Sequence, residues 1–250
     1  MKPEDADELR ARFLPLEGSL NFRDLGGRPA LGGRRVRWGR LFRADALHHL
    51  TERDVEHLRE AVGLRTIVDL RSSSESDAPS PRLLAPPVAY HRIPLFERDG
   101  GRDAPSGLGL DMLYFAMMSF AQERIARVVD LLARSSEPAV FHCAAGKDRT
   151  GVVAAVVLGA VGVPDEEIVH DYACTRRSLE QIIERLRSTA GYEYVFEELP
   201  PETLHAEPDT MESLLGRVRE RWGSMRGYLL EAGLPEETLA RLAASLLEVA

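Results

Sequence analysis

The chain has 250 residues, a net charge of −8 and an apolar share of 44%, values that allow one sizeable α/β domain with a full core. The acidic balance argues against non-specific binding to nucleic acid or to an anionic membrane surface. The longest apolar run, residues 152–163, is about half of a membrane span, so no transmembrane helix is expected.

Cysteine and lysine are both scarce. The two cysteines, Cys143 and Cys174, are too few for a disulfide framework and favour a reducing compartment such as the cytoplasm. No apolar segment of a secretory signal peptide is visible at the start of the sequence. Nearly all positive charge is arginine, and the lysines are Lys2 and Lys147 alone. A lysine retained at position 147 therefore suggests a specific use there.

The first segments of the chain carry weak or turn-like patterns. Residues 3–14 fit a short surface helix or a frayed terminus equally well, so residues 1–15 are treated as an extension. Residues 21–33 are rich in Gly and Arg and predict a loop. Residues 36–43 predict a strand or hairpin, with Trp38 and Phe42 in the core.

A helix and two strands follow. Thr51 and the acids after it resemble a capping box, which predicts a helix from residue 51 to residue 62 with Gly63 as its C-cap. Residues 66–71 and 88–95 predict strands. Of the residues after the first of these strands, Arg71 and Glu75 are interpreted as a structural ion pair rather than as pocket residues.

The middle of the chain crowds apolar side chains into one segment. Residues 108–120 are rich in Leu, Met and aromatic residues and are expected to merge into a helix through residue 132. A core helix is the favoured interpretation. The alternative is a lid or an apolar wall of a substrate pocket, to which Tyr114 would contribute.

Next comes a loop held between a buried strand and a buried helix. Residues 138–141 predict the strand, and residues 152–158 are apolar on nearly every face and predict the helix. Cys143 opens the loop, and Arg149 stands six positions later. The first turn of a helix has unpaired amides and the positive end of the dipole, so this loop predicts an oxyanion site.

The residue types of the loop fit that chemistry. Ala144, Ala145 and Gly146 are small, which lets backbone amides close around an anion. Arg149 supplies a planar fork for two oxygens. The same field favours the thiolate of Cys143, and a thiolate facing a bound phosphorus atom is a nucleophile for covalent catalysis.

Helices account for the rest of the sequence. They are expected over residues 164–187, 211–230 and 236–249. Cys174 falls in the first of them and is expected to be a packed thiol. No linker composition separates these segments from the remainder, so a single domain over residues 1–250 is predicted.

The Cys-x5-Arg loop resembles the signature of the cysteine-dependent protein tyrosine phosphatase superfamily. With Lys147 and Asp148 inside the loop, it is similar to a bacterial branch of tyrosine-specific or broad-specificity phosphatases that also carry an Asn-Phe-Arg-Asp motif. That motif occupies residues 21–24. Residues 69–71 and 171–172 also fit, so the resemblance runs from about residue 16 to the end of the chain.

The resemblance implies a fold and a reaction. The fold is a protein tyrosine phosphatase-like α/β fold, with a central, mostly parallel sheet flanked by helices and with extra C-terminal helices. The reaction is hydrolysis of phosphotyrosine through a cysteinyl phosphate, with phosphoserine, phosphothreonine and phosphoinositides as further substrates. The partner is thus a phosphorylated protein or a phosphoinositide. No cofactor, metal, nucleic acid or stable membrane insertion is expected.

Roles for individual residues follow from the same resemblance. Cys143 is the expected nucleophile, and Arg149 with the amides of residues 144–149 holds the phosphoryl oxygens. Asp148 is the expected general acid, since a carboxyl beside a bound dianion retains its proton. Tyrosine phosphatases generally carry this acid on a loop ahead of the cysteine strand, which leaves an alternative set of acids: Glu97, Asp99 and Asp103.

Supporting residues are also implied. His142 is expected to fix the loop by bonding to backbone, and Thr150 to donate a hydrogen bond to the departing thiolate. Lys147 adds a second cation at the pocket rim, as in phosphoinositide phosphatases. Arg23 and Asp24 either shape the pocket or pair with each other.

Other interpretations fit the residues of the loop less well. A nucleotide-binding P-loop fails because residue 141 is Phe rather than Gly and residue 148 is Asp rather than Ser or Thr. A rhodanese-like sulfurtransferase also presents a cysteine at a helix N-terminus, but it would not explain Asp148. A catalytically silent module that binds phosphorylated ligands remains a third class. Cys143 as a plain buried thiol is disfavoured by the arginine and the strand–helix context.

Overall fold

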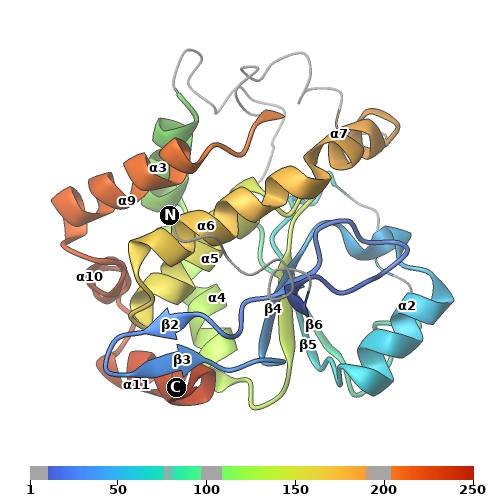
Figure 1. Cartoon of the computed structure of the whole chain (residues 1–250), viewed down its shortest axis with the longest axis horizontal. Helices are drawn as coiled ribbons and strands as arrows, with labels where there is room; N and C mark the ends of the chain where they lie inside the picture. Colours follow the sequence, from blue (N-terminus) through green and yellow to red (C-terminus); the bar gives the residue numbers. More distant parts are fainter. Residues whose placement is uncertain (1–10, 76–78, 80, 97–108, 190–191, 193–203) are drawn as a thin grey trace.

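The computed structural model of the chain describes residues 11–75, 79, 81–96, 109–189, 192 and 204–250. Figure 1 shows a sheet in the middle of the molecule with helices on both sides. Its strands, in spatial order, are β1 (Arg23–Asp24), β4 (Leu41–Ala44), β7 (Ala139–His142), β5 (Thr66–Asp69) and β6 (Ala89–Arg92). β1 pairs with β4 in the antiparallel sense, whereas all other neighbours are parallel. This sheet confirms the predicted fold class.

Successive residues of the central strands face opposite sides of the sheet, and each side has its own core. Phe42, Ile67 and Val140 belong to a cluster that packs under α2 (Glu52–Glu56) and the π-helix η2 (His57–Ala61). Because strand residues alternate between faces, their neighbours Val68 and Phe141 enter the larger core on the other side. The sheet is therefore covered on both faces, as parallel sheets usually are.

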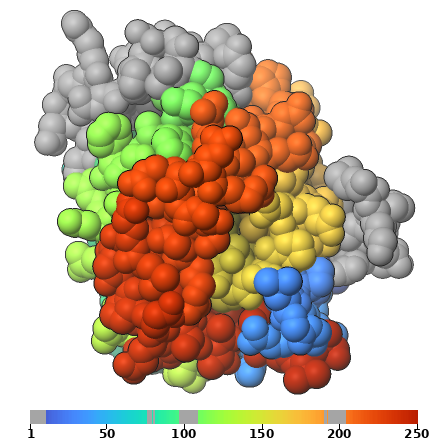
Figure 2. All heavy atoms as spheres, turned by 90° about the vertical axis from the view of Figure 1, so that its left-hand side faces the viewer, coloured from blue at the N-terminus to red at the C-terminus, as the bar shows by residue number. Residues whose placement is uncertain are grey.

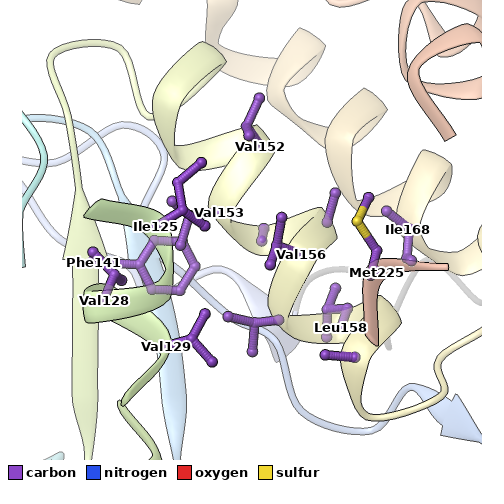
Figure 3. Close-up of a cluster of buried hydrophobic side chains, with 14 of the residues drawn as sticks. Ile125, Val128, Val129, Phe141, Val152, Val153, Val156, Leu158, Ile168 and Met225 are labelled. Atoms are coloured by element: carbon purple, nitrogen blue, oxygen red, sulfur yellow. The ribbon is translucent and has the colours of Figure 1, made fainter. Parts of the chain in front are cut away.

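The larger core is built around one helix. The helices on this side are α3 (Leu110–Phe120), α4 (Gln122–Arg134), α5 (Asp148–Ala160), α6 (Asp165–Ala173), α7 (Leu179–Arg187), α9 (Pro208–Trp222), α10 (Met225–Glu231) and α11 (Glu236–Leu246). α5 is buried on nearly every face, as its sequence predicts. Figure 3 shows Val153 and Val156 of α5 between Phe141 of the sheet and Met225 of α10.

A second, small sheet joins the two ends of the described chain. It contains β2 (Pro29–Ala30), β3 (Arg34–Val36) and β8 (Leu247–Val249), all antiparallel. Figure 2 shows the N-terminal residues of this sheet beside the C-terminal residues on one face of the molecule. Two predictions were wrong here. Residues 21–33 include strands rather than loop alone, and residues 247–249 form a strand rather than the end of a helix, because β3 offers them an edge.

Other predicted boundaries need correction. Residues 36–43 do not form one strand or hairpin, since β3 and β4 lie in different sheets. Trp38 is 40% exposed rather than in the core. Its ring lies against the backbone of Gly27 on one side and has the Arg12 guanidinium 4.9 Å from its centroid. The ring thus covers glycine backbone at the surface, where no Cβ could fit.

Three predicted helices are interrupted. The helix expected through residue 132 breaks at Ala121, because α3 packs on α9 whereas α4 packs on α11. The helix expected over residues 164–187 is divided by a 3₁₀ segment, η3 (Cys174–Ser178). The helix expected over residues 211–230 is divided into α9 and α10 at Gly223, which has a φ of +75°.

The helix expected from residue 51 starts as predicted: Thr51 forms a capping box with Asp54, and Gly63 has a φ of +71°.

None of the described helices is long and apolar enough to cross a membrane. The helical extension proposed for residues 3–14 falls largely outside the described residues, of which residues 11 and 12 are helical.

Candidate active site

The cysteine loop (residues 143–149) follows the central strand of the large sheet. β7 has a parallel neighbour on each side, and His142 is level with both Ala44 of β4 and Asp69 of β5. Cys143 therefore emerges where three strands end together. In parallel sheets, this carboxyl edge is where ligands bind.

A glycine makes the loop turn back into α5. Gly146 has a φ of +66°, a backbone conformation that favours glycine over all other residues. A Cβ at this position would lie 2.5 Å from the carbonyl oxygen of Ala44, far inside van der Waals contact. The loop thus passes directly over the end of β4, and no larger residue fits there.

Donors from behind hold the carbonyl groups of the loop. Asn21 Nδ2 lies 3.1 Å from the carbonyl oxygen of Ala145 and 3.2 Å from that of Gly146. Arg43 Nη2 donates to the same Gly146 oxygen at 2.6 Å. The amide of Ala46 donates to the carbonyl of Ala144 at 2.9 Å.

The amides of the loop are left for a ligand. Within the part of the chain that the structure describes, no backbone carbonyl accepts a hydrogen bond from the amides of residues 144–148. α5 begins at Asp148, and no side chain caps its N-terminus. Unpaired amides at a helix N-terminus suit an oxyanion. The predicted cradle is therefore present in the backbone geometry.

The cysteine lies at the floor of this cradle with a histidine behind it. Cys143 is 1% exposed, and His142 is fully buried. His142 Nδ1 lies 3.2 Å from the carbonyl oxygen of Cys143, which can only accept. Burial lowers the pKa of His142 despite the nearby charge of Asp69, so a neutral imidazole that donates from Nδ1 fits this contact. The histidine thus bonds to the backbone of Cys143.

Thr150 lies one residue beyond the loop, in the first turn of α5. Its side chain is fully buried, and its hydroxyl has no hydrogen-bond partner among the described residues. A buried hydroxyl without a partner is unusual. The hydroxyl can therefore donate to the departing thiolate of Cys143, which is the role that the sequence suggested for Thr150.

A carboxylate holds the arginine of the loop. Arg149 Nη1 lies 2.5 Å from Glu75 Oε2, and Nη2 lies 2.7 Å from Oε1, which is a bidentate pair. Burial would raise the pKa of Glu75, but the charge and hydrogen bonds of Arg149 lower it to about 2. The Phe96 ring centroid lies 5.5 Å from the guanidinium carbon. The position of the fork is thus fixed by charge and by stacking.

The predicted ion pair between Arg71 and Glu75 was wrong. Arg71 instead binds Asp69, with Nη2 2.8 Å from Oδ2. Asp69 ends β5, and Glu75 follows it in the chain. Asp69 binds Arg71 of the segment after β5, whereas Glu75 binds Arg149 of α5. Spacing along the sequence could not tell which arginine each carboxylate would meet.

Lys147 and Asp148 contact each other at the open side of the loop. Lys147 Nζ lies 2.6 Å from Asp148 Oδ1. The hydroxyl of Tyr114 lies 2.6 Å from the same oxygen. The Asp148 side chain is 34% exposed, whereas that of Lys147 is 3% exposed. The structure therefore brings Tyr114 of α3 to the loop, where the sequence suggested a pocket residue.

Arg23 lies behind the loop, while Asp24 binds a nearby turn. Arg23 is fully buried and donates to the side-chain oxygen of Asn21, the residue that holds two loop carbonyls. Asp24 accepts from the amides of Gly26 and Gly39, at 2.7 and 2.6 Å. Among the described residues, Arg23 forms its ion pair with Asp171 rather than with Asp24. In the described part of the chain, no hydrogen bond joins Asp24 to the cysteine loop.

A buried cluster behind the loop contains Arg23, Arg28, Arg43 and Asp171, and the sequence suggested a role for Arg23 alone among these arginines. Asp171 Oδ1 lies 3.0 Å from Arg23 Nε and 3.3 Å from Arg28 Nη2, and Oδ2 accepts from Arg43. Burial raises the pKa of Asp171, but the charges of the arginines outweigh it and lower the pKa well below its ordinary value. Burial and Arg23 lower the pKa of Arg43 to about 10. The Asn-Phe-Arg-Asp motif at residues 21–24 and the Asp171-Tyr172 dipeptide were the sequence signals that pointed here.

The other acids suggested for catalysis, Glu97, Asp99 and Asp103, lie outside the described residues. Among the described residues, no group of three His, Cys, Asp or Glu side chains is placed to hold a metal ion.

Comparison with known proteins finds a tyrosine phosphatase family and several protein phosphatases. The sequence profile of the tyrosine phosphatase family matches residues 14–248. The triple specificity protein phosphatase PtpB of Mycobacterium tuberculosis is 29% identical, over 96% of this chain and all of that protein. A tyrosine-protein phosphatase of Nostoc commune is 32% identical, over 78% of this chain and 70% of its own length.

One further relative and one solved structure are also similar to this chain. A putative tyrosine-protein phosphatase of Cupriavidus necator is 30% identical over 85% of this chain and 81% of its own length. Among solved structures, that of Pseudomonas aeruginosa TpbA aligns with 80% of this chain and 91% of its own, at 17% identity and a TM-score of 0.32.

Proposed function

This chain belongs to the tyrosine phosphatase family, and from that premise we propose that it hydrolyses phosphotyrosine through a phosphorylated cysteine at position 143. The observation that supports this proposal most strongly is the cysteine loop itself. Its carbonyls are held from behind by Asn21 and Arg43, its amides at residues 144–148 donate to no backbone carbonyl of the described chain, and Glu75 fixes the Arg149 guanidinium. Such preorganised donors stabilise the charge that spreads over phosphoryl oxygens in the transition state.

The reaction has two steps. In the first, the Cys143 thiolate attacks phosphorus in line, a sulfur–phosphorus bond forms and the bond to the tyrosine oxygen breaks. Asp148 gives its proton to the leaving oxygen. In the second step, water attacks phosphorus and returns its proton to Asp148, the sulfur–phosphorus bond breaks, and Cys143 leaves as a thiolate that the hydroxyl of Thr150 can stabilise.

Asp148 is proposed as the acid because of its place. It begins α5 beside the amide cradle, and a third of its side chain is open to solvent, so it can reach a leaving group and exchange protons. A positioned acid contributes about 10²–10⁴-fold.

The Asp148→Asn variant tests this assignment. It should lose most rate with phosphate esters of poor leaving groups and little with p-nitrophenyl phosphate, whose leaving group needs no proton. Equal losses with both substrates would return the role to an acid in the 97–103 segment.

Substrate range is proposed to extend beyond phosphotyrosine. The relative from M. tuberculosis is named for triple specificity, and Lys147 offers a second cation near the cradle. We infer that phosphoserine, phosphothreonine and phosphoinositides are also turned over, with Lys147 favouring phosphoinositides. Lys147→Ala should then lower phosphoinositide turnover more than phosphotyrosine turnover, and an equal loss would refute a lipid-selective role.

The scarcity of cysteine supports a reducing compartment such as the cytoplasm as the location.

One assay separates the three classes of function. A phosphatase hydrolyses an aryl phosphate, is inhibited by vanadate and loses activity in the Cys143→Ser variant. A sulfurtransferase would instead consume thiosulfate, and a silent binding module would bind phosphotyrosine peptide without turnover. Thiosulfate consumption, or aryl phosphate hydrolysis that survives in Cys143→Ser, would contradict the proposed function.

A further inference from the structure

Asp148 receives two hydrogen-bond donors on a single carboxylate oxygen. The Tyr114 hydroxyl and the Lys147 ammonium group each lie 2.6 Å from Oδ1. No hydrogen bond to Oδ2 is formed by the described residues. When this carboxyl group is protonated, the proton must therefore be on Oδ2, because Oδ1 already accepts from two donors.

Tyr114 is held so that it can only donate to this oxygen. Its side chain is 1% exposed, and its hydroxyl lies 2.9 Å from the hydroxyl of Tyr172. Burial, and then the charge of Asp148, raise the pKa of Tyr114 well above its ordinary value, so the phenol keeps its proton. Tyr172 thus donates to Tyr114, and Tyr114 donates to Asp148.

Packing fixes the two rings. They meet edge to face, with centroids 6.0 Å apart. The Tyr172 ring also lies against α5, where a Cβ on Gly151 would be 3.1 Å from Cδ2 of Tyr172. Both rings come from neighbouring helices, α3 and α6, and converge on the first turn of α5.

We propose that Tyr114 is the positioning residue for the proton donor Asp148, with Tyr172 orienting the Tyr114 hydroxyl. The proposal rests on the function proposed above, in which Asp148 is the general acid. Tyr114 keeps Oδ1 turned toward the protein interior, which presents the protonated Oδ2 to the leaving oxygen.

The charged groups around this relay come from several elements. Lys147 of the loop faces Asp148 directly. Arg43 of β4 and Glu207, which precedes α9, act on Tyr172. Lys147 Nζ also lies 3.4 Å from the Tyr114 hydroxyl, so Tyr114→Phe removes a long contact of this lysine together with the donor to Asp148.

The test compares Tyr114→Phe with Tyr228→Phe. Tyr228 is an equally buried phenol that also bonds to α3, with its hydroxyl 2.8 Å from the carbonyl of Met118. It has no hydrogen bond to the cysteine loop, so it controls for the loss of a buried hydroxyl. Both variants are assayed with phenyl phosphate, a poor leaving group, and with p-nitrophenyl phosphate, a good one, across a range of pH.

For Tyr114→Phe we expect kcat/KM to fall roughly tenfold with phenyl phosphate and less than about twofold with p-nitrophenyl phosphate, since only the first needs a well-placed acid. Tyr228→Phe should show no such selective loss. If Tyr114→Phe behaves as Tyr228→Phe does, the positioning role is refuted.

A double variant separates this inference from the function on which it rests. Adding Tyr114→Phe to Asp148→Asn should cause no further selective loss with phenyl phosphate if Tyr114 acts through Asp148. A further selective loss would show that Tyr114 acts by another route. Asp148→Asn without leaving-group dependence would instead refute the acid assignment itself, and the positioning role with it.

Discussion

The cysteine loop is held on two sides that differ in construction. Behind it, Asn21, Arg23, Arg43 and Asp171 are all buried, and each makes several hydrogen bonds. In front, the Asp148 carboxyl is 34% exposed and is bound through one oxygen. A buried, multiply bonded support keeps the shape of the amide cradle constant, whereas a partly open carboxyl can gain and lose a proton. The buried residues behind the loop therefore fix the shape of the cradle, and Asp148 on the open side transfers the proton.

The largest effect on stability should come from disrupting the buried residues behind the loop. Asp171→Asn leaves three buried arginines without their shared carboxylate, so the free energy of unfolding should fall by about 3–5 kcal/mol. Urea titration measures the loss. The control is Asp165→Asn in the same helix, whose exposed pair with Arg219 should contribute less than about 1 kcal/mol. Comparable losses in the two variants would mean that the buried cluster is not a special support.

The second effect depends on pH and concerns Glu75, which holds Arg149 in place. Its pKa is lowered to about 2 from the ordinary 4.5, so the pair contributes stability that is fully present above about pH 4.5 and is lost as the pH falls toward 2. The contribution is on the order of 3 kcal/mol. Urea titrations between pH 7 and pH 2 should show the wild-type protein losing this advantage over Glu75→Gln. A difference between the two that does not change with pH would contradict the assignment.

The third effect weakens one contact between the back and the loop. Asn21→Asp keeps an acceptor for Arg23 but removes the donors to the carbonyls of Ala145 and Gly146. The Gly146 carbonyl keeps Arg43 as a donor, whereas the Ala145 carbonyl loses its side-chain donor. A buried acceptor that loses its donor costs about 1–3 kcal/mol, so kcat/KM should fall by about ten- to a hundredfold. Inhibition by vanadate should weaken in parallel, because the cradle itself is disturbed. Unchanged vanadate affinity would indicate that Asn21 serves folding alone.

Local sequence explains the loop and much of the sheet. The apolar strand before Cys143, the small residues after it and Gly146 are neighbours in the chain, and their geometry depends mainly on one another. The same is true of the capping box at Thr51. These features were predictable because the residues that determine them lie within a few positions.

The supports behind the loop were not predictable in the same way. Arg43 and Asp171 are far apart in the sequence, and nothing local indicates that their charges meet. The break at Ala121 and the strand at residues 247–249 also depend on partners from other segments. Trp38 looks like a core residue by composition, yet its place is decided by the glycine backbone that it covers.

Trapping the intermediate tests the central claim most directly. The protein is mixed with an aryl phosphate, quenched in acid within the first turnover and digested, and the peptides are analysed by mass spectrometry. We expect one phosphoryl group on the peptide that contains Cys143, bound to its sulfur, and none in the Cys143→Ser protein. A phosphoryl group on another residue, or product formed in that turnover with no phosphorylated protein, would contradict the account.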